Sequence, residues 1–305
     1  MACTIKPAEI KRVKGLGFLQ NKGTDLFNGR ILTKNGKITA EQMAVIAEAA
    51  KLFGNGDVEF TTRLSVEVRG IHYDNIEAFI NFVAPAGLET GGTGAKVRPV
   101  VSCKGTTCQY GLYDTFDLSE KIHERFYKGY HEVTLPHKFK IATGGCPNSC
   151  VKPSLNDIGV VGKMIPVLHE DLCKNCKKCQ VEAVCPMKAA KAEDGKVTIH
   201  EDVCIKCGRC VKGCLFKAVS GTQGYEIYIG GRWGKKIAHG MPLSKIFTSE
   251  EEVLDTIEAT ILLFREQGKA GERFSDTIER IGFEKVDEEL ISKEILNRKE
   301  QILNA

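Results

Sequence analysis

The chain has 305 residues, 42% of them hydrophobic, which is enough for two or three modest cores and excludes a small peptide scaffold. The net charge of +4 is spread along the chain, and no run of five or more like charges indicates a nucleic-acid-binding tail. No apolar stretch reaches the roughly 18 residues that a membrane span needs, and the N-terminal stretch lacks the apolar core of a secretory signal, so we expect a cytoplasmic protein.

The first part of the chain predicts a small α+β domain over residues 10–85. A strand is expected at residues 26–32, followed by a helix that Thr39 caps. Gln42 stands three residues after Thr39, the spacing of a capping box, and Gly54 is the natural end of that helix. A helix packed on strands is the usual composition of an α+β domain.

A strand pattern follows this helix. Apolar and polar residues alternate over residues 58–69, which predicts one half-buried strand with Arg63 and Arg69 on its polar face. A second helix is expected from residue 74 to residue 83, and the glycine-rich residues 87–94 mark the end of the domain.

The 13 cysteines are clustered in the sequence. Twelve of them form three groups of four, which in a chain without a secretory signal favours metal binding over disulfides. Cys3 stands alone and is expected to be an ordinary thiol at a frayed end. One group consists of two separated pairs, and its spacing alone would permit zinc: Cys103, Cys108, Cys146 and Cys150.

The other two groups belong to an internal repeat. Glu170-Asp171-Leu172-Cys173 returns as Glu201-Asp202-Val203-Cys204, and Lys188-Ala189 returns as Lys217-Ala218. We interpret residues 169–219 as a duplicated cysteine unit.

The cysteine spacing of this unit is close to that of bacterial ferredoxins with two [4Fe-4S] clusters. In such ferredoxins the fourth cysteine of each unit ligates the other cluster. One cluster is therefore expected on Cys173, Cys176, Cys179 and Cys214, and the other on Cys204, Cys207, Cys210 and Cys185. A pair of zinc sites is the alternative, although structural zinc generally uses two separated cysteine pairs. The unit departs from the pattern in two places: five residues precede Cys185 where three are usual, and Leu215 replaces the customary proline.

Beyond the repeat, residues 225–229 predict a strand that leads into a glycine loop rich in cations at residues 230–236. A helix with a second capping-box pattern is expected from Ser249 to Gly268, with an apolar stripe along one face. The charged stretch from Asp287 is expected to be a solvated helix.

The group of two separated cysteine pairs carries a resemblance to a known family. Cys146-Pro147-Asn148-Ser149-Cys150 closely resembles the Cys-Pro-Asn-x-Cys signature of siroheme sulfite and nitrite reductases, in which a [4Fe-4S] cluster and the siroheme iron share one cysteine. The resemblance implies that Cys150 is the bridging thiolate. The pair Cys103 and Cys108 has four intervening residues where many family members have five.

The resemblance extends from about residue 15 to residue 282. Thr61-Thr62-Arg63 resembles the family's Thr-Thr-Arg segment, residues 135–141 resemble its Leu-Pro-x-Lys-Phe-Lys segment, and residues 96–100 match an arginine-bearing segment more loosely. The family's anion-binding cations thus carry over to Arg63, Arg98, Lys138 and Lys140. Such cations would hold and polarise an anion at the heme iron and supply protons as its oxygens leave as water. Lys138 and Lys140 by themselves could equally be a solvated strand face.

Siroheme carries several carboxylates, so its pocket needs cations and hydrogen-bond donors. Candidates for this role are Arg69, Lys104, Thr106, Thr107, Asn148, Arg232 and Lys235.

The implied fold is an α+β half-repeat of a sulfite/nitrite reductase. It comprises a ferredoxin-like small domain, a siroheme domain over residues 86–168 and 220–282, an inserted ferredoxin domain at 169–219, and a helical tail at 283–305. The implied cofactors are siroheme and three [4Fe-4S] clusters.

The implied activity is reduction of sulfite to sulfide, because an internal ferredoxin in this position resembles the dissimilatory and anaerobic sulfite reductases. Nitrite reduction to ammonium and a non-catalytic electron-transfer subunit are the alternatives. An external donor such as a ferredoxin or a reductase subunit would supply electrons. Because larger relatives join two such halves, the resemblance also implies a homodimer in which the cations of one subunit face the siroheme held by Cys150 of its partner.

Overall fold

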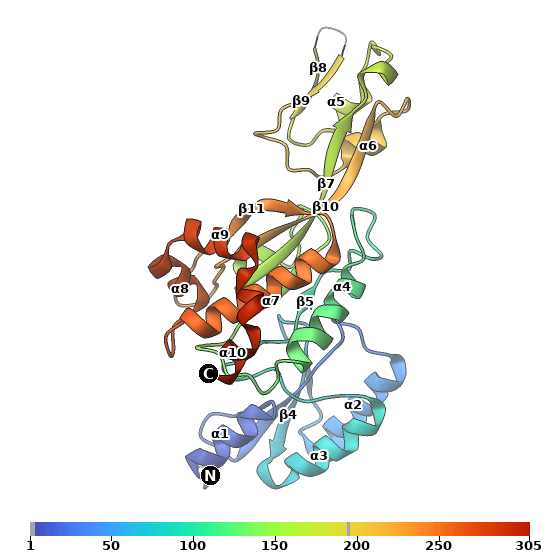
Figure 1. The fold of residues 1–305 in the computed structure, drawn as a ribbon. Coiled ribbons are helices and arrows are strands. Elements are labelled where there is room, and N and C mark those ends of the chain that lie inside the picture. Colours follow the sequence, from blue (N-terminus) through green and yellow to red (C-terminus); the bar gives the residue numbers. More distant parts are fainter. Residues whose placement is uncertain (1–3, 194–195) are drawn as a thin grey trace.

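The computed structural model describes residues 4–193 and 196–305, so the prediction for Cys3 lies outside the described residues. Figure 1 shows three parts in a row: a small domain that contains the N-terminus, a central domain, and a lobe at the far end. In these ranges, no helix combines the length and the apolar character that crossing a bilayer requires.

The small domain is a four-stranded antiparallel sheet with three helices. In spatial order its strands are β1 (Phe18–Gln20), β2 (Leu26–Ile31), β4 (Val66–His72) and β3 (Val58–Phe60). Its helices are α1 (Pro7–Gly15), α2 (Ala40–Phe53) and α3 (Ile76–Val83). The predicted capping box is confirmed, because the Thr39 side chain accepts a hydrogen bond from the Gln42 amide and the Gln42 side chain accepts one from the Thr39 amide. Helix α2 ends at Gly54 as predicted.

The prediction of one continuous strand over residues 58–69 is wrong. Strands β3 and β4 form an antiparallel hairpin, and the chain turns between Thr61 and Ser65. Leu64 has a positive φ of 61°, which a strand cannot accommodate. The Thr61 hydroxyl closes the turn by accepting hydrogen bonds from the amides of Arg63 and Ser65. Arg63 therefore lies at the tip of a hairpin and does not share a strand face with Arg69.

The central domain is built on a five-stranded mixed sheet. In spatial order its strands are β11 (Met241–Phe247), β10 (Val219–Ile229), β7 (Ile158–Leu168), β6 (Ile141–Gly144) and β5 (Val101–Ser102). Strands β5, β6 and β7 are parallel, so all three begin at one edge of the domain and end at the opposite edge. Its longer helices are α4 (Thr115–Ile122), α7 (Glu250–Gln267), α8 (Phe274–Ile281), α9 (Phe283–Ser292) and α10 (Lys299–Asn304).

Short helical turns connect the helices and strands in all three parts of the molecule. They are η1 (Tyr73–Asn75), η2 (Ala84–Ala86), the π-helical η3 (His123–Lys128), η4 (Pro153–Leu155), η5 (Glu170–Leu172) and η6 (Glu294–Arg298). Helix α7 begins after the Ser249 cap and ends at Gly268, as predicted, but its burial extends beyond one stripe. A helix buried on most of its circumference is a central core element.

The expectation of a solvated C-terminal helix is also wrong. Residues 283–305 form α9, η6 and α10, which pack against α7. Val286, Leu290, Ile295 and Ile302 belong to the same buried cluster as the strands of the central sheet. Burial of several aliphatic side chains makes this segment part of the core.

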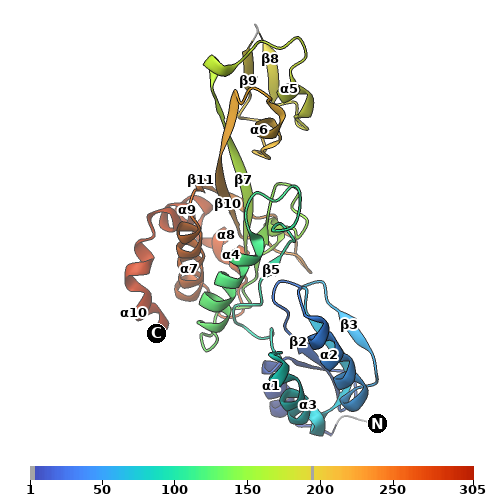
Figure 2. The ribbon, with the colours of Figure 1, turned by 90° about the vertical axis from the view of Figure 1, so that its right-hand side faces the viewer.

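The lobe stands at the end of a long two-stranded ribbon. Strands β7 and β10 remain paired from Ile158 opposite Ile229 to Leu168 opposite Val219, and the chain between them forms the lobe (Figures 1 and 2). The lobe contains α5 (Gln180–Val184), β8 (Ala190–Glu193), β9 (Lys196–Ile199) and α6 (Arg209–Gly213). Its small core is built from Val181, Ala190 and Val219 together with cysteine side chains.

Candidate functional site

The structure brings the four predicted anion-binding cations to one edge of the central domain. Arg98 precedes β5, and Lys138 and Lys140 precede β6, so all three lie where these parallel strands begin. Arg63 reaches them from the hairpin tip of the small domain. Its guanidinium donates to the Asn156 side-chain oxygen, with an N–O distance of 3.0 Å.

The two arginines are held by neutral oxygens. Arg63 also donates to the Pro99 carbonyl, with an N–O distance of 2.9 Å, and Arg98 donates to the carbonyls of Gly92 and Gly94. Carbonyl oxygens fix the direction of a guanidinium without neutralising its charge. These two side chains are therefore oriented and remain available to an anion.

The pKa values of the cations show that their charges are close together and partly desolvated. Burial lowers the pKa of Arg63 to about 10 and that of Arg98 to about 10, and the charge of Arg98 adds to the effect on Arg63. Burial lowers the pKa of Lys140 to about 8, with the charge of Arg63 as the next cause. Burial and then the charge of Arg273 lower the pKa of Lys138. A bound anion would relieve this repulsion.

One buried carboxylate organises the cluster. Asp157 is fully buried, and its two oxygens lie 2.9 and 3.1 Å from one guanidinium nitrogen of Arg273. It also accepts a hydrogen bond from the backbone amide of Lys140, with an N–O distance of 2.8 Å. Burial raises the pKa of Asp157, although Arg273 opposes the shift.

Sequence reasoning missed this part of the site. Asn156, which holds Arg63, and Asp157 are adjacent and directly precede β7, and Arg273 comes from the start of α8. The available signal was the pair of polar residues Asn156 and Asp157 directly before an apolar stretch that begins at Ile158. Asp157 and Arg273 are 116 residues apart in the sequence, so no local sequence pattern predicts that they pair.

The predicted cluster cysteines Cys103 and Cys146 lie at the opposite edge, where β5 and β6 end. Two glycines let their loops touch, because a Cβ on Gly145 would lie 2.9 Å from the Gly105 Cα. The Gly145 amide donates to the Cys103 sulfur, with an N–S distance of 3.1 Å. Only residues without a side chain permit such close approach of two backbones.

Cys146 is close enough to the other three thiols of this group to be affected by them. Burial raises the pKa of Cys146, a backbone hydrogen bond from Asn148 lowers it, and Cys103, Cys150 and Cys108 raise it further. Mutual repulsion among thiolates favours a positively charged metal centre between them. The donor set thus fits an iron-sulfur cluster, and the backbone of Asn148, a residue predicted to bind cofactor, contacts the Cys146 sulfur.

The cations and the thiols of one chain are far apart. Lys140 and Cys146 bracket β6, and Arg98 and Cys103 bracket β5. At about 3.3 Å per residue, the six steps from Lys140 to Cys146 span at most about 20 Å. One chain therefore places Arg98 and Lys140 at the opposite ends of β5 and β6 from Cys103 and Cys146.

Two predicted siroheme partners are already paired with carboxylates. Arg69 lies 3.7 Å from Asp57 and 3.4 Å from Glu59 in the small domain, so the structure does not bring it to the site. Arg232 donates to both oxygens of Asp276, with N–O distances of 2.9 and 2.8 Å. A guanidinium held by its own carboxylate is less available to a cofactor.

The remaining candidates differ in availability. Thr106 donates to Asp114, with an O–O distance of 2.6 Å, and helps to cap α4. Thr107 donates to the Lys104 carbonyl, with an O–O distance of 3.3 Å. The Lys104 and Lys235 side chains are exposed and form no ion pair within the described ranges.

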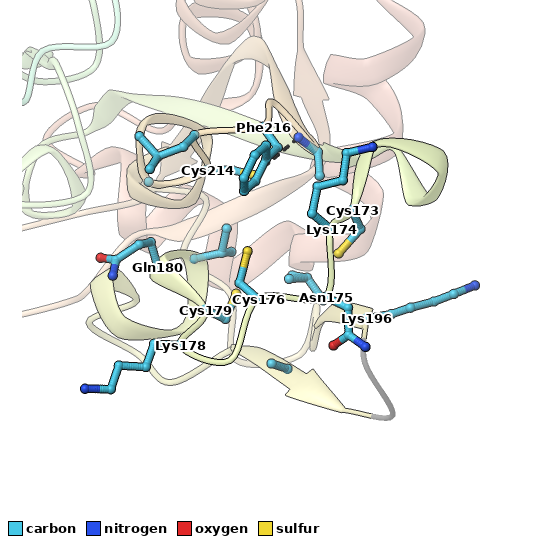
Figure 3. A pocket seen from close by; sticks show the side chains of 16 residues that line it. Cys173, Lys174, Asn175, Cys176, Lys178, Cys179, Gln180, Lys196, Cys214 and Phe216 are labelled. Carbon is cyan, nitrogen blue, oxygen red and sulfur yellow. Dashed lines mark hydrogen bonds between the residues drawn. The ribbon is translucent and has the colours of Figure 1, made fainter.

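The lobe contains two cavities, each lined by one predicted set of four cysteines. A cavity of about 210 Å³, drawn in Figure 3, is lined by Cys173, Cys176, Cys179 and Cys214. A second, smaller cavity is lined by Cys185, Cys204, Cys207 and Cys210. Among the described residues, no three His, Cys, Asp or Glu side chains are close enough to hold a single metal ion. A cubane spreads its thiolates over four iron atoms and so requires wider spacing.

Comparison with known proteins relates the two larger domains to one family. The model for the nitrite and sulphite reductase 4Fe-4S domain matches residues 93–299, and that for the nitrite/sulfite reductase ferredoxin-like half domain matches residues 18–85. An uncharacterised protein of Methanocaldococcus jannaschii is 33% identical over 262 residues, which cover 85% of this chain and 89% of that protein.

Two further comparisons involve named sulfite reductases. The coenzyme F420-dependent sulfite reductase of Methanocaldococcus jannaschii is 32% identical over 263 residues, which cover 84% of this chain but 41% of that enzyme. The crystal structure of dissimilatory sulfite reductase I superposes with a TM-score of 0.70 at 23% identity, covering 87% of this chain and 69% of that chain, and supports the fold. With most of its length matched by the two domain models, the chain belongs to the nitrite and sulphite reductase family.

Proposed function

We propose that this protein is a siroheme-dependent sulfite reductase that converts sulfite to sulfide. The observation that carries the proposal is the group of converging cations, in which Arg63 and Arg98 are oriented by neutral oxygens and keep their charge. Sulfite is a small anion with three oxygens, and reduction to sulfide must remove all three as water. A site with fixed positive charge and proton donors meets both needs.

The residues of this chain have distinct tasks in that reaction. Arg63 and Arg98 hold the anion through charge-assisted hydrogen bonds. Lys138 and Lys140 carry protons toward its oxygens, and the lowered pKa of Lys140, about 8, allows it to release a proton near neutral pH. Asp157 fixes the backbone at Lys140 and balances part of the charge. Siroheme and its cluster, when bound through Cys103, Cys108, Cys146 and Cys150, would supply electrons and an iron that takes the anion.

Sulfite is preferred over nitrite because two sulfite reductases match 80% or more of this chain in sequence, whereas two nitrite reductases match less than half of it. A non-catalytic subunit has no need for several uncompensated cations at one point. We further propose that residues 169–219 hold two [4Fe-4S] clusters, since each cavity of the lobe is lined by one predicted set of four cysteines. The total would be three clusters and one siroheme per chain.

We also propose that two copies of the chain share each site. In one copy Lys140 and Cys146 lie at opposite ends of β6, and Arg98 and Cys103 at opposite ends of β5, so a symmetric pair can bring the cations of one copy to the thiols of the other. Exposed apolar side chains lie in the same loop as Arg232: Trp233 and Ile237 are each 59% exposed. Burial lowers the pKa of Lys138, as do the charges of Arg273 and Arg98 and, to a lesser extent, that of Arg232. A second copy would cover this surface.

The test is cofactor analysis joined to an assay with both anions. Anaerobically purified protein is expected to contain iron for three clusters and one siroheme, with a chlorin-type absorption band. With reduced viologen dye it should form sulfide from sulfite at a higher kcat/KM than ammonium from nitrite. Bound zinc, a missing chlorin band, or no turnover of either anion would contradict the proposal.

The pKa of Lys140 predicts how the rate depends on pH. Because the protonated lysine is the active form, kcat/KM for sulfite should fall as pH rises through about 8. Arginine keeps its proton across this range, so a Lys140→Arg enzyme should retain a lower rate but lose this decline. The measurement is kcat/KM between mildly acidic and alkaline pH for both proteins. An identical alkaline decline in the variant would show that another group titrates.

A further inference from the structure

The two cysteine units of the lobe differ in their surroundings. The second unit is tied to the central domain: the Lys163 ammonium donates to the Ile205 carbonyl, and the Met164 amide donates to the Lys206 carbonyl. The Arg209 guanidinium lies 5.4 Å from the centre of the Tyr110 ring, in the loop that follows Cys108. The second unit therefore faces the rest of the protein.

The first unit faces solvent. Residues 174–178 are all exposed, whereas the corresponding residues 205–209 of the second unit are mostly half-buried or buried. Three lysines stand between the first cysteines, namely Lys174, Lys177 and Lys178, and in the part of the chain that the structure describes none forms an ion pair. Figure 3 shows Lys178 pointing away from the cavity. The positive charges of these three lysines are therefore not neutralised by ion pairs.

An exposed apolar pair lies beside these lysines. Leu215, which replaces the customary proline after Cys214, is 84% exposed, and Phe216 is 49% exposed. Both residues line the same cavity as Lys174 and Lys178. Exposing two large apolar side chains side by side is unfavourable in an isolated protein and is typical of a contact surface.

The internal repeat offers a direct comparison. Cys185-Pro186-Met187-Lys188-Ala189 corresponds to Cys214-Leu215-Phe216-Lys217-Ala218, so Met187 is the counterpart of Phe216. Met187 is 45% exposed, but proline precedes it. Fewer cations lie between the closely spaced cysteines of the second unit than between those of the first unit. Exposed apolar side chains and positive charge thus occur together at the first unit.

We propose that Leu215, Phe216 and the three lysines form the docking face for a small acidic protein that carries one electron at a time. The proposal rests on the proposed function, because it requires a cluster on Cys173, Cys176, Cys179 and Cys214. At each encounter the carrier is oxidised by one electron and that cluster is reduced by one, with no bond made or broken. Reduction of one sulfite to sulfide takes six such encounters.

The chemistry of the face selects this partner. The exposed lysines attract acidic side chains around the contact of a partner and accelerate the encounter, and this attraction weakens as salt screens it. Leu215 and Phe216 supply a dry contact close to the cluster ligand Cys214, which shortens the path for an electron. A basic carrier would be repelled.

The experiment measures the Kd of the holoprotein for a reduced, acidic plant-type [2Fe-2S] ferredoxin by anaerobic calorimetry. The Leu215→Ser/Phe216→Ser variant and the Lys174→Glu/Lys177→Glu/Lys178→Glu variant are each expected to raise Kd about tenfold or more. For the native protein, Kd should rise steeply with ionic strength. Iron content, measured first, confirms that the variants keep their clusters. Leu215→Pro, which restores the customary residue, is a milder variant expected to weaken binding in the same direction.

Two matched controls isolate the face. Met187→Ser removes the counterpart of Phe216, and Lys11→Glu/Lys22→Glu/Lys51→Glu makes the same charge change on the small domain. Both should keep Kd within about twofold, because their sites are away from the contact. Absence of ferredoxin binding, a Kd independent of salt, or equal losses in the controls would overturn the proposal. Viologen-driven turnover bypasses the carrier, so failure of that assay would contradict the proposed function alone.

Discussion

Replacing Lys138 and Lys140 together by alanine is expected to lower kcat for viologen-driven sulfite reduction by about 10²–10⁴-fold, because the site loses its two proton-carrying side chains. Iron and siroheme content should stay at the native level. The reason is geometric: both lysines precede β6, whereas the proposed cluster ligand Cys146 follows it. Binding of sulfite should weaken as well, since Arg63 and Arg98 would hold the anion alone.

The measurement is steady-state kinetics beside iron analysis and an absorption spectrum. Lys269→Ala is the control, since Lys269 is an exposed lysine of the same domain and forms no ion pair within the described residues. It should leave kcat unchanged. Full activity of the double variant, or loss of its siroheme band, would remove the two lysines from the proton-carrying role.

Replacing Asp157 by alanine is expected to destabilise the central domain by about 3–5 kcal/mol, the usual effect of leaving a buried charge without its partner. The Arg273 side chain is 7% exposed and Asp157 is fully buried, so water cannot replace the lost carboxylate. The backbone amide of Lys140 would lose its acceptor at the same time. The midpoint of denaturant-induced unfolding should fall accordingly.

Two further variants separate charge from shape. Asp157→Asn keeps an acceptor for the Lys140 amide and should be less damaging than alanine. Glu120→Ala removes an exposed ion pair with Lys34 and should cost less than about 1 kcal/mol. If Asp157→Ala unfolds at the native midpoint, the carboxylate does not organise the cation cluster.

Local chemistry explains which elements the sequence could predict. A capping box needs only neighbouring residues, so the start of α2 at Thr39 and the cap of α7 at Ser249 were predictable. The β3–β4 turn was not, because the alternation of residue types continues through it and only the positive φ of Leu64 breaks the strand. The C-terminal helices are rich in charged residues, so the few apolar residues that become buried could not be recognised from the sequence. Their burial depends on packing against α7.

The site residues that lie within recognisable sequence motifs could be predicted. Arg63, Arg98 and the pair Lys138 and Lys140 come from three separate segments, and the resemblance to the family assigned them one role before the structure placed them together. Their support could not be predicted, since Asp157 meets Arg273 only after the chain has folded. The separation of cations from thiols also needed the parallel pairing of β5 with β6, which no local pattern reveals.

That separation leads to the central claim, that each catalytic site combines the cations of one copy with the thiols of another. The most direct measurement uses two differently tagged subunits, one Lys138→Ala/Lys140→Ala and the other Cys150→Ala, isolated together as a mixed dimer. If sites are shared, one of the two sites has intact cations and an intact Cys150, and activity should return to about half of the native value by symmetry. If each site lies within one chain, both are damaged, and a mixed dimer as inactive as either parent would contradict the claim.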